Sequence, residues 1–240
     1  MPTIQEAVQA AAPGDVVTIP AGVYDVSNLT LPSDITLRAD GDVTIVGNFI
    51  VDGANTVVEG FTFEGGKVDL GYSQNAAVRD CVFNGGEASI NYSWATGAEI
   101  TNNDFNNVAG PALDGWEVNE ATISGNNFAN CWQGINLNFN DNPAYGNDIL
   151  IEQNSFTNTA WMPIEAGAGG AYTSNLVVRG NWSDNSNVSD PEGAMTAWCA
   201  ATRPTAPATT RRSCSAGSSG TTCRPSGRRG RTCAPAAPSR

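Results

Sequence analysis

The chain has 240 residues with six cysteines and no histidine, and residues 1–198 carry 24 acidic against four basic side chains, a net charge of −20. The missing histidine excludes His-based triads, histidine general bases and zinc sites with imidazole ligands. No apolar stretch approaches the roughly 18 residues of a membrane span, and no signal-peptide core precedes the first predicted element.

A short helix is predicted at residues 3–12. Thr3 and Glu6 have the spacing of a capping box, in which each side chain accepts a hydrogen bond from the other residue's backbone. The apolar residues of this segment recur on one helical face, and Pro13 with Gly14 ends it. Such a helix would cover the exposed end of a repetitive core.

After a first strand and turn over residues 15–25, six segments share one pattern of short apolar runs. They align on Val58, Val78, Ile100, Ile123, Ile151 and Val178, with spacings of 20, 22, 23, 28 and 27 residues. Within each segment apolar residues alternate and are rich in Val, Ile and Phe, which is typical of strands. Repeats of this length, each with two or three short strands, predict a parallel β-helix solenoid of about seven to eight coils.

Two further positions recur in the repeat. Three residues after the aligned aliphatic residue, four successive units carry Asn103, Asn126, Asn154 and Asn181, and the two preceding units carry Phe61 and Cys81. Coils about 4.8 Å apart would allow these amides to form a hydrogen-bonded ladder. The repeated phenylalanines would stack inside the solenoid in the same way; they are Phe63, Phe83, Phe105, Phe128 and Phe156.

The segment from Ala12 to Tyr24, APGDVVTIPAGVY, and the repeated I-x-x-N-x-F units resemble the right-handed parallel β-helix proteins of the pectate-lyase-like superfamily. The resemblance covers nearly all of residues 3–190 and implies an all-β fold. It is specific for fold and poor for chemistry, because this superfamily includes polysaccharide lyases, glycoside hydrolases, epimerases, phage tailspikes and non-catalytic surface proteins. It also implies that a long polysaccharide lies along one stack of strands, and an extracellular, cell-surface or virion location.

The strand after each repeat unit is therefore where we expect a site. If Leu113, Ile135 and Ile164 point inward, strand alternation turns their successors outward. These successors are Asp114, Asn136 and Glu165, and Asp69 extends the row by two coils. Asp114 and Glu165 would be about 9 to 10 Å apart at the backbone, a separation that suits the acid and base of an inverting glycosidase.

Three tryptophans lie in or beside the same strands. Exposed indoles offer flat apolar faces on which sugar rings stack, so we expect Trp116, Trp132 and Trp161, with Asp69 and Asn136, to bind substrate. The structural alternative is that the carboxylates only solvate an acidic domain and that the indoles pack in the core or between coils.

A lyase or epimerase fits the residues less well than a hydrolase. Polyuronate lyases of the resembled fold use an arginine or lysine base with calcium, and Lys67 is the only basic residue expected on this face, with Arg79 and Arg179 on another. A strongly acidic surface also repels a polyanion, so a neutral or cationic glycan is the easier partner, and nucleic acid is not expected.

No cofactor or metal is otherwise indicated. The loop 138–143 offers oxygen ligands of the kind calcium prefers, with one carboxylate, Asp141, among amides. Cys81 and Cys131 are expected to be small buried residues and not reactive thiols.

Residues 199–240 differ from the rest of the chain. They contain eight arginines, no acidic residue and only seven residue types, none of them a large apolar one. Such a segment buries too little apolar surface to offset the entropy of ordering, so it is expected to be a disordered tail after one domain over residues 1–198. Its composition is that of GC-rich DNA translated out of frame. The alternative is a basic arm that binds an acidic surface or nucleic acid, which the lack of lysine and aromatic residues disfavours.

Two functions of different classes follow. The first is a polysaccharide-cleaving enzyme, a hydrolase in preference to a lyase, with Asp114 and Glu165 as acid and base. The second is a non-catalytic adhesin, spike or scaffold that binds glycan. The sequence predicts neither the substrate nor the oligomeric state.

Overall fold

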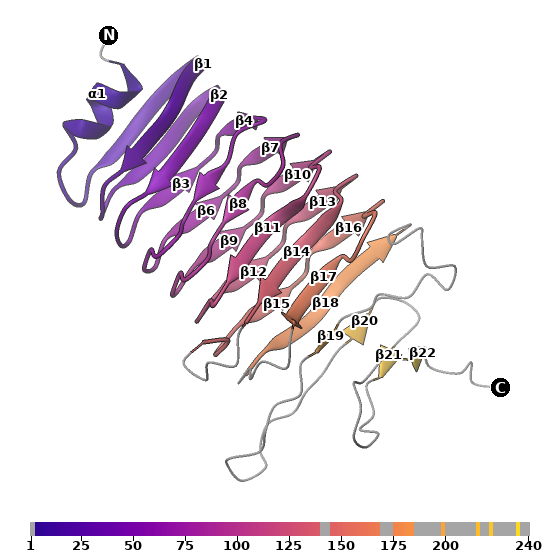
Figure 1. Cartoon of the computed structure of the whole chain (residues 1–240). Helices are drawn as coiled ribbons and strands as arrows, with labels where there is room; N and C mark the ends of the chain where they lie inside the picture. The colour runs from indigo at the N-terminus through magenta and orange to yellow at the C-terminus, as the bar shows by residue number, and fades with distance from the viewer. Residues whose placement is uncertain are drawn as a thin grey trace.

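The structure is a computed structural model, which describes residues 3–139, 145–168 and 175–184 together with four two-residue strands further along the chain. The only helix in these residues is α1 (Ile4–Gln9), at the N-terminal end of the solenoid (Figure 1). The predicted capping box is present: Thr3 N donates to Glu6 Oε2 at 2.7 Å, and Glu6 N donates to Thr3 Oγ1 at 3.2 Å. Ile4 and Val8 are buried, so the helix covers the end of the core as expected.

The first two windings are long continuous strands. β1 (Val16–Leu31) pairs in parallel with β2 (Thr36–Val51). The register shifts between Pro20 and Gly22 and again between Val26 and Asn28, which are the places where the winding turns a corner. The predicted first strand over residues 15–25 is thus only part of a longer one.

Five coils with three separate strands each follow. The solenoid has about six turns, slightly fewer than the expected seven to eight. The first face holds β3 (Val57–Glu59), β6 (Ala77–Arg79), β9 (Glu99–Thr101), β12 (Thr122–Ser124) and β15 (Leu150–Glu152). The second holds β4 (Thr62–Glu64), β7 (Val82–Asn84), β10 (Asp104–Asn106), β13 (Asn127–Ala129) and β16 (Ser155–Thr157). The third holds β5 (Val68–Asp69), β8 (Ile90–Asn91), β11 (Pro111–Trp116), β14 (Gln133–Asn138) and β17 (Ile164–Ala168).

The last long strand, β18 (Val177–Asp184), pairs with both β15 and β16. The four short strands are β19 (Trp198–Cys199), β20 (Ser215–Ala216), β21 (Thr221–Thr222) and β22 (Ala234–Pro235). Apart from these, the expected tail 199–240 lies outside the described residues, so its assignment stays a prediction.

The predicted repeat is confirmed by the register of the coils. Every strand pair between neighbouring coils is parallel, and the aligned aliphatic residues from Val58 to Val178 are direct partners in the core. The five phenylalanines from Phe63 to Phe156 form a continuous stack, with successive ring centroids 4.8, 5.1, 4.8 and 4.7 Å apart. The fold is therefore an all-β parallel β-helix.

The asparagine ladder is also present. Asn126 Oδ1 accepts hydrogen bonds from the backbone N and the side-chain amide of Asn103, at 2.9 and 3.0 Å, while its own Nδ2 donates to the Ile100 carbonyl at 2.9 Å. Asn154 and Asn181 repeat this pattern on the next two coils. Each amide thus satisfies buried backbone groups of two coils at a corner that has no regular strand pairing.

Both cysteines of the domain are buried, as predicted. Burial raises the pKa of the Cys81 thiol from 9.0 to about 12, and that of Cys131 to about 11. A buried protonated thiol is a poor nucleophile, which agrees with a structural role.

Candidate functional site

One row of outward side chains runs up the third face. Register places Asp69 beside Asn91, Asn91 beside Asp114, Asp114 beside Asn136, and Asn136 beside Glu165. These five residues, which we call the polar column, are half-buried. Their predecessors on the strands are buried in the core: Val68, Ile90, Leu113, Ile135 and Ile164. The structure thus places Asp69, Asp114, Asn136 and Glu165 in the predicted row, and adds Asn91.

Carboxylates and amides alternate along the polar column. Asn91 Nδ2 donates to Asp69 Oδ1 at 2.9 Å, and Asn136 Nδ2 donates to Asp114 Oδ1 at 2.8 Å. Carboxylates on adjacent coils would lie about 4.8 Å apart and repel, whereas the intervening amides double that spacing and supply donors. The column therefore repeats its negative charge on every second coil.

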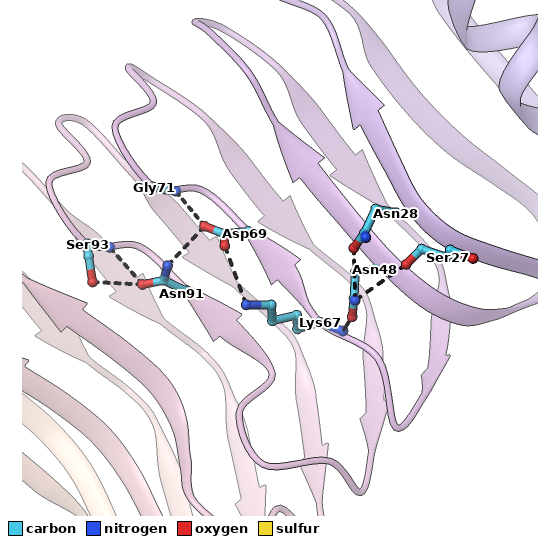
Figure 2. A network of polar contacts seen from close by, with 8 residues as sticks. All are labelled: Ser27, Asn28, Asn48, Lys67, Asp69, Gly71, Asn91 and Ser93. Atoms are coloured by element: carbon cyan, nitrogen blue, oxygen red, sulfur yellow. Dashed lines mark hydrogen bonds and ion pairs between the residues drawn. The ribbon is translucent and has the colours of Figure 1, made fainter.

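Figure 2 shows the end of the column nearest the N-terminus, which we call its lower end; upper coils are those toward the C-terminus. Asp69 Oδ1 also accepts from the Gly71 backbone at 3.0 Å, and Asp69 Oδ2 forms an ion pair with Lys67 Nζ at 3.5 Å. Asn91 Oδ1 accepts from the backbone and hydroxyl of Ser93, at 3.2 and 2.7 Å. The lower column is therefore held by its own hydrogen bonds, and its lysine is already paired with a carboxylate.

Two more amides brace the upper end. Asn138 Nδ2 donates to Asn136 Oδ1 at 2.9 Å, and Gln133 Nε2 donates to Glu165 Oε2 at 2.9 Å. Within the described part of the chain, Asp114 and Glu165 each accept one amide hydrogen bond. The contacts of the two carboxylates are therefore alike in kind.

A buried tyrosine supports the centre of the column from inside. The Tyr92 hydroxyl donates to the Asn136 carbonyl, two coils above, at 3.3 Å. Burial, together with the negative charge of Asp114, raises the pKa of Tyr92 well above its usual range. This phenol therefore stays protonated and available as a donor at ordinary pH.

All three predicted tryptophans are exposed: 37% of Trp116, 44% of Trp132 and 46% of Trp161 is open to solvent, so none of them is buried in the core. Packing between coils, the other part of the structural alternative, is present for Trp132 and Trp161. Trp132 and Trp161 stack with ring centroids 6.1 Å apart and planes 4° from parallel. Each indole therefore has one face directed at its neighbour, and a sugar can stack only on the opposite face or against an edge.

Sequence reasoning missed a second aromatic pair. Tyr72, 72% exposed, and Trp94, 39% exposed, stack with centroids 5.0 Å apart and planes 5° from parallel. Each lies three residues after a member of the polar column, Asp69 or Asn91. That shared spacing could have predicted that the two residues lie on neighbouring coils. Both lie in the turn after the strand, however, where strand alternation does not predict which way a side chain points.

The basic residues lie as predicted. Arg79 and Arg179 are on the first face, in ion pairs with Glu59 and Glu152. Among the described residues, no group of three metal-binding side chains is present. The loop considered for calcium includes residues 140–143, which lie outside the described ones, so that suggestion stays untested.

Comparison with known proteins identifies the architecture. Residues 66–189 match a family model described as right handed beta helix region. A search of curated proteins found no match. Within the residues that the structure describes, no helix has the length and apolar character needed to cross a membrane.

Several solved structures share the fold. One is the surface protein and adhesin PfbA of Streptococcus pneumoniae, with a TM-score of 0.59 and 14% identity over 74% of this chain and 60% of that chain. Another is a tailspike protein of E. coli bacteriophage HK620 in complex with a pentasaccharide, with a TM-score of 0.56 and 13% identity over 75% of this chain and 45% of that chain. The chain thus spans about half the length of these proteins, and at such identities the likeness is one of fold.

Proposed function

The chain belongs to the right-handed β-helix family, and on that premise we propose that it binds a glycan on the third face, over the polar column. The observation that carries the proposal is the combination found there: five outward carboxylates and amides in register, with exposed aromatic rings at their sides. Carboxylates and amides accept and donate hydrogen bonds to sugar hydroxyls, and aromatic rings contact the apolar faces of sugar rings.

The similar proteins support this proposal. One is a surface adhesin and the other is a phage tailspike bound to a pentasaccharide. By this analogy we also propose an extracellular, cell-surface or virion location.

Charge narrows the class of glycan. The polar column holds three carboxylates, and the single lysine beside it is paired with Asp69. With a net charge of −20 over residues 1–198, the face repels polyanions. We therefore propose a neutral or cationic glycan and no nucleic acid.

The binding proposal is tested by calorimetric titration against a panel of neutral, cationic and polyanionic polysaccharides. We expect binding to one or more neutral or cationic polymers and a loss of affinity in Trp132→Ala and Trp161→Ala. Trp182→Ala is the matched control, because that indole is equally exposed but pairs with Ser155 on the second face. Binding that is lost equally in the control, or that is confined to polyanions, would overturn the proposal.

Hydrolysis of the bound glycan is the second candidate function. It is favoured by one observation: Asp114 and Glu165 lie in the same row with Asn136 between them. Their backbones are then about 9.5 Å apart, and inverting glycosidases hold their two carboxyl groups about 6.5 to 9.5 Å apart. One carboxylic acid would protonate the glycosidic oxygen as its bond to the anomeric carbon breaks, while the other carboxylate takes a proton from the attacking water.

Hydrolysis requires two carboxyl groups in different protonation states, which binding does not. One of the two carboxyl groups must be protonated and the other ionised, yet among the residues that the structure describes each accepts a hydrogen bond from one amide, so these contacts do not distinguish them. For this reason a glycan-binding protein without catalysis, an adhesin or spike, is the simpler form of the proposal.

A reducing-sugar assay over the same panel separates the two. If the protein is a hydrolase, Asp114→Asn and Glu165→Gln each abolish turnover, while Asp104→Asn, an exposed acid on the second face, leaves it unchanged. Turnover that survives in both site variants would discard these residues as acid and base. Binding without turnover in the wild type would leave the non-catalytic function.

A further inference from the structure

The two aromatic pairs lie at opposite edges of the third face. Tyr72 and Trp94 follow β5 and β8, so they border the face where its strands end. Trp132 and Trp161 precede β14 and β17, so they border it where the strands begin. The first pair belongs to the lower coils of the stack and the second pair to the upper coils.

Apart from Trp116, the neighbouring positions at the two edges are not aromatic. On the coil below Trp132, the backbone N of Trp132 donates to the carbonyl of Val108. One coil further down, the backbone N of Ala109 donates to the carbonyl of Gly86, so the residues at this edge are small or aliphatic. Above Trp94 the edge continues with Trp116, whose register partner on the next coil is Asn138. The exposed rings therefore follow a diagonal across the face, from the lower coils at one edge to the upper coils at the other.

The centre of this diagonal is the middle of the polar column. Asn91, Asp114 and Asn136 lie between the two pairs, on the coils that join them. Asp114 and Asn136 are hydrogen-bonded to each other at this point. A ligand that touches both pairs must cross these side chains.

From this arrangement we propose that Tyr72 and Trp94 form a second sugar-binding subsite, and that one linear uncharged glycan crosses the face obliquely from this subsite to the Trp132–Trp161 pair. This inference rests on the proposed function and adds to it a subsite, a direction and a minimum ligand length. The large exposed fraction of Tyr72 means that its ring, although stacked on Trp94 on one side, is open to a sugar on the other.

The length of the occupant follows from the geometry of strands and coils. Trp94 lies three residues after Asn91, and Trp132 lies four residues before Asn136, two coils higher. Six residues of extended chain lead from Trp132 to Asn138 at the end of β14, the register partner of Trp116 beside Trp94. At about 3.3 Å per residue the two edges are about 20 Å apart, and with two coils of about 4.8 Å the pairs are at most about 25 Å apart. A disaccharide can therefore occupy one subsite only, whereas a chain of several sugars can occupy both.

The charges along the diagonal favour an uncharged glycan. Between the two pairs the diagonal crosses a single carboxylate, Asp114, flanked by the amides of Asn91 and Asn136, so it repels a polyanion and offers a polycation only one counter-charge. Its ends are aromatic pairs, which bind sugar rings by their apolar faces. A neutral chain would bind with little dependence on salt, whereas a polycation would bind less tightly as salt is added.

The test uses cellulose-, laminarin- and mannan-derived oligosaccharides, graded from disaccharide to octasaccharide, together with chitosan oligosaccharides as a polycation, and affinities are measured at low and high salt. For the series that binds, we expect the double variant Tyr72→Ala/Trp94→Ala to lower octasaccharide affinity by about tenfold, and Trp132→Ala/Trp161→Ala to do the same. Disaccharide affinity at one site should fall when one aromatic pair is removed, and not when the other is. The variant Tyr72→Phe/Trp94→Phe keeps aromatic rings and should keep affinity, and Trp182→Ala is the control on another face.

Each contrary result has a distinct meaning. If octasaccharide affinity falls in Trp132→Ala/Trp161→Ala but not in Tyr72→Ala/Trp94→Ala, the second subsite is overturned and the proposed function stands. Affinity for a polycation alone would overturn the uncharged occupant. Wild-type protein that binds none of the three series, at any length, would defeat the neutral-glycan proposal itself. Sedimentation that shows a dimer, dissociated by Tyr72→Ala/Trp94→Ala, would assign this aromatic pair to contact between two copies of the chain.

Discussion

The ring of Tyr92 occupies the space into which a side chain at residue 115 would extend. A Cβ atom built on Gly115 would lie 2.6 Å from Tyr92 Cζ, which is closer than such atoms approach in proteins. Gly115 directly follows Asp114 of the polar column, and the Tyr92 hydroxyl reaches the carbonyl of Asn136. The glycine thus lets one buried phenol support the column from beneath.

Gly115→Ala should therefore destabilise the protein by about 1 to 3 kcal/mol, the usual cost of overpacking a close-packed core. Tyr92→Phe, which removes only the hydroxyl, should cost about 1 kcal/mol. Urea denaturation measures both. Combining Gly115→Ala with Tyr92→Ala should cost less than the sum of the two single changes, because the clash disappears; strictly additive costs would contradict the proposed packing.

Asn126, in the middle of the asparagine ladder, should contribute far more to the free energy of unfolding than an asparagine on the outside of the solenoid. Asn126→Ala removes the acceptor of the Asn103 backbone and the donor to Ile100, leaving buried groups without partners. We expect a loss of about 3 kcal/mol or more in the free energy of unfolding. Asn84→Ala is the matched control, since Asn84 contacts Glu64 on the outside of the solenoid, and it should cost less than about 0.5 kcal/mol.

Cys81 and Cys131 should not react with a thiol reagent in the folded protein. Their pKa values of about 12 and about 11 keep the buried thiols protonated at ordinary pH. The measurement uses a variant in which the cysteines of residues 199–240 are replaced by serine, so that only these two remain. Reaction should be complete in denaturant and very slow without it; rapid labelling of the native protein would contradict their burial.

The same thiols make stability depend on pH. In the unfolded chain a thiol ionises near its ordinary pKa of 9.0, whereas in the folded protein it stays protonated to about pH 11 or 12. The raised pKa means that their contribution is fully present below pH 9.0 and is lost as the pH rises toward these values. Replacing Cys81 with serine should remove part of this alkaline loss.

Glu59 should stabilise the fold only while it is ionised. It accepts hydrogen bonds from Arg38 and from Arg79, the latter at 2.8 Å, and although burial raises its pKa, the two guanidinium groups together hold that pKa below its ordinary value of 4.5. A depressed pKa means that the contribution is present above pH 4.5 and is lost as the pH falls through the folded-state value.

The stability difference between wild type and Glu59→Gln should therefore shrink as the pH is lowered below 4.5. Because both arginines are substantially exposed, it should also be modest and decrease with added salt. Urea titrations at several pH values measure it. Glu64→Gln, on an exposed glutamate that contacts only an amide in the described structure, is the control and should show a smaller change; an equal change would contradict the role of the arginines.

Much of the site was predictable because residues in a β-helix contact partners one repeat away. The spacing of Asp114, Asn136 and Glu165 matched the repeat, and the structure places them in one register row. Asn91 was missed as a member of the row, although it alternates with Ile90 in the same way. The catalytic and sugar-binding roles of these residues stay predictions.

The aromatic residues were harder to predict. Trp132 and Trp161 were identified by residue type and by their place near the strands, but their mutual stacking was not. Tyr72 and Trp94 lie in turns, where successive side chains no longer alternate between two sides. Only the spatial arrangement shows that both pairs border the same face at opposite edges.

The amino-acid sequence by itself determined the solenoid, its capping helix, its internal ladders and the row of polar side chains, because a repeated pattern of alternating apolar residues permits one way of burying them all. The tertiary structure alone decided which amide donates to which carboxylate, which aromatic rings face one another and which ring faces stay open. Those relationships depend on side-chain conformations in neighbouring coils, and such conformations are set by packing between residues 20 or more positions apart, not by local spacing.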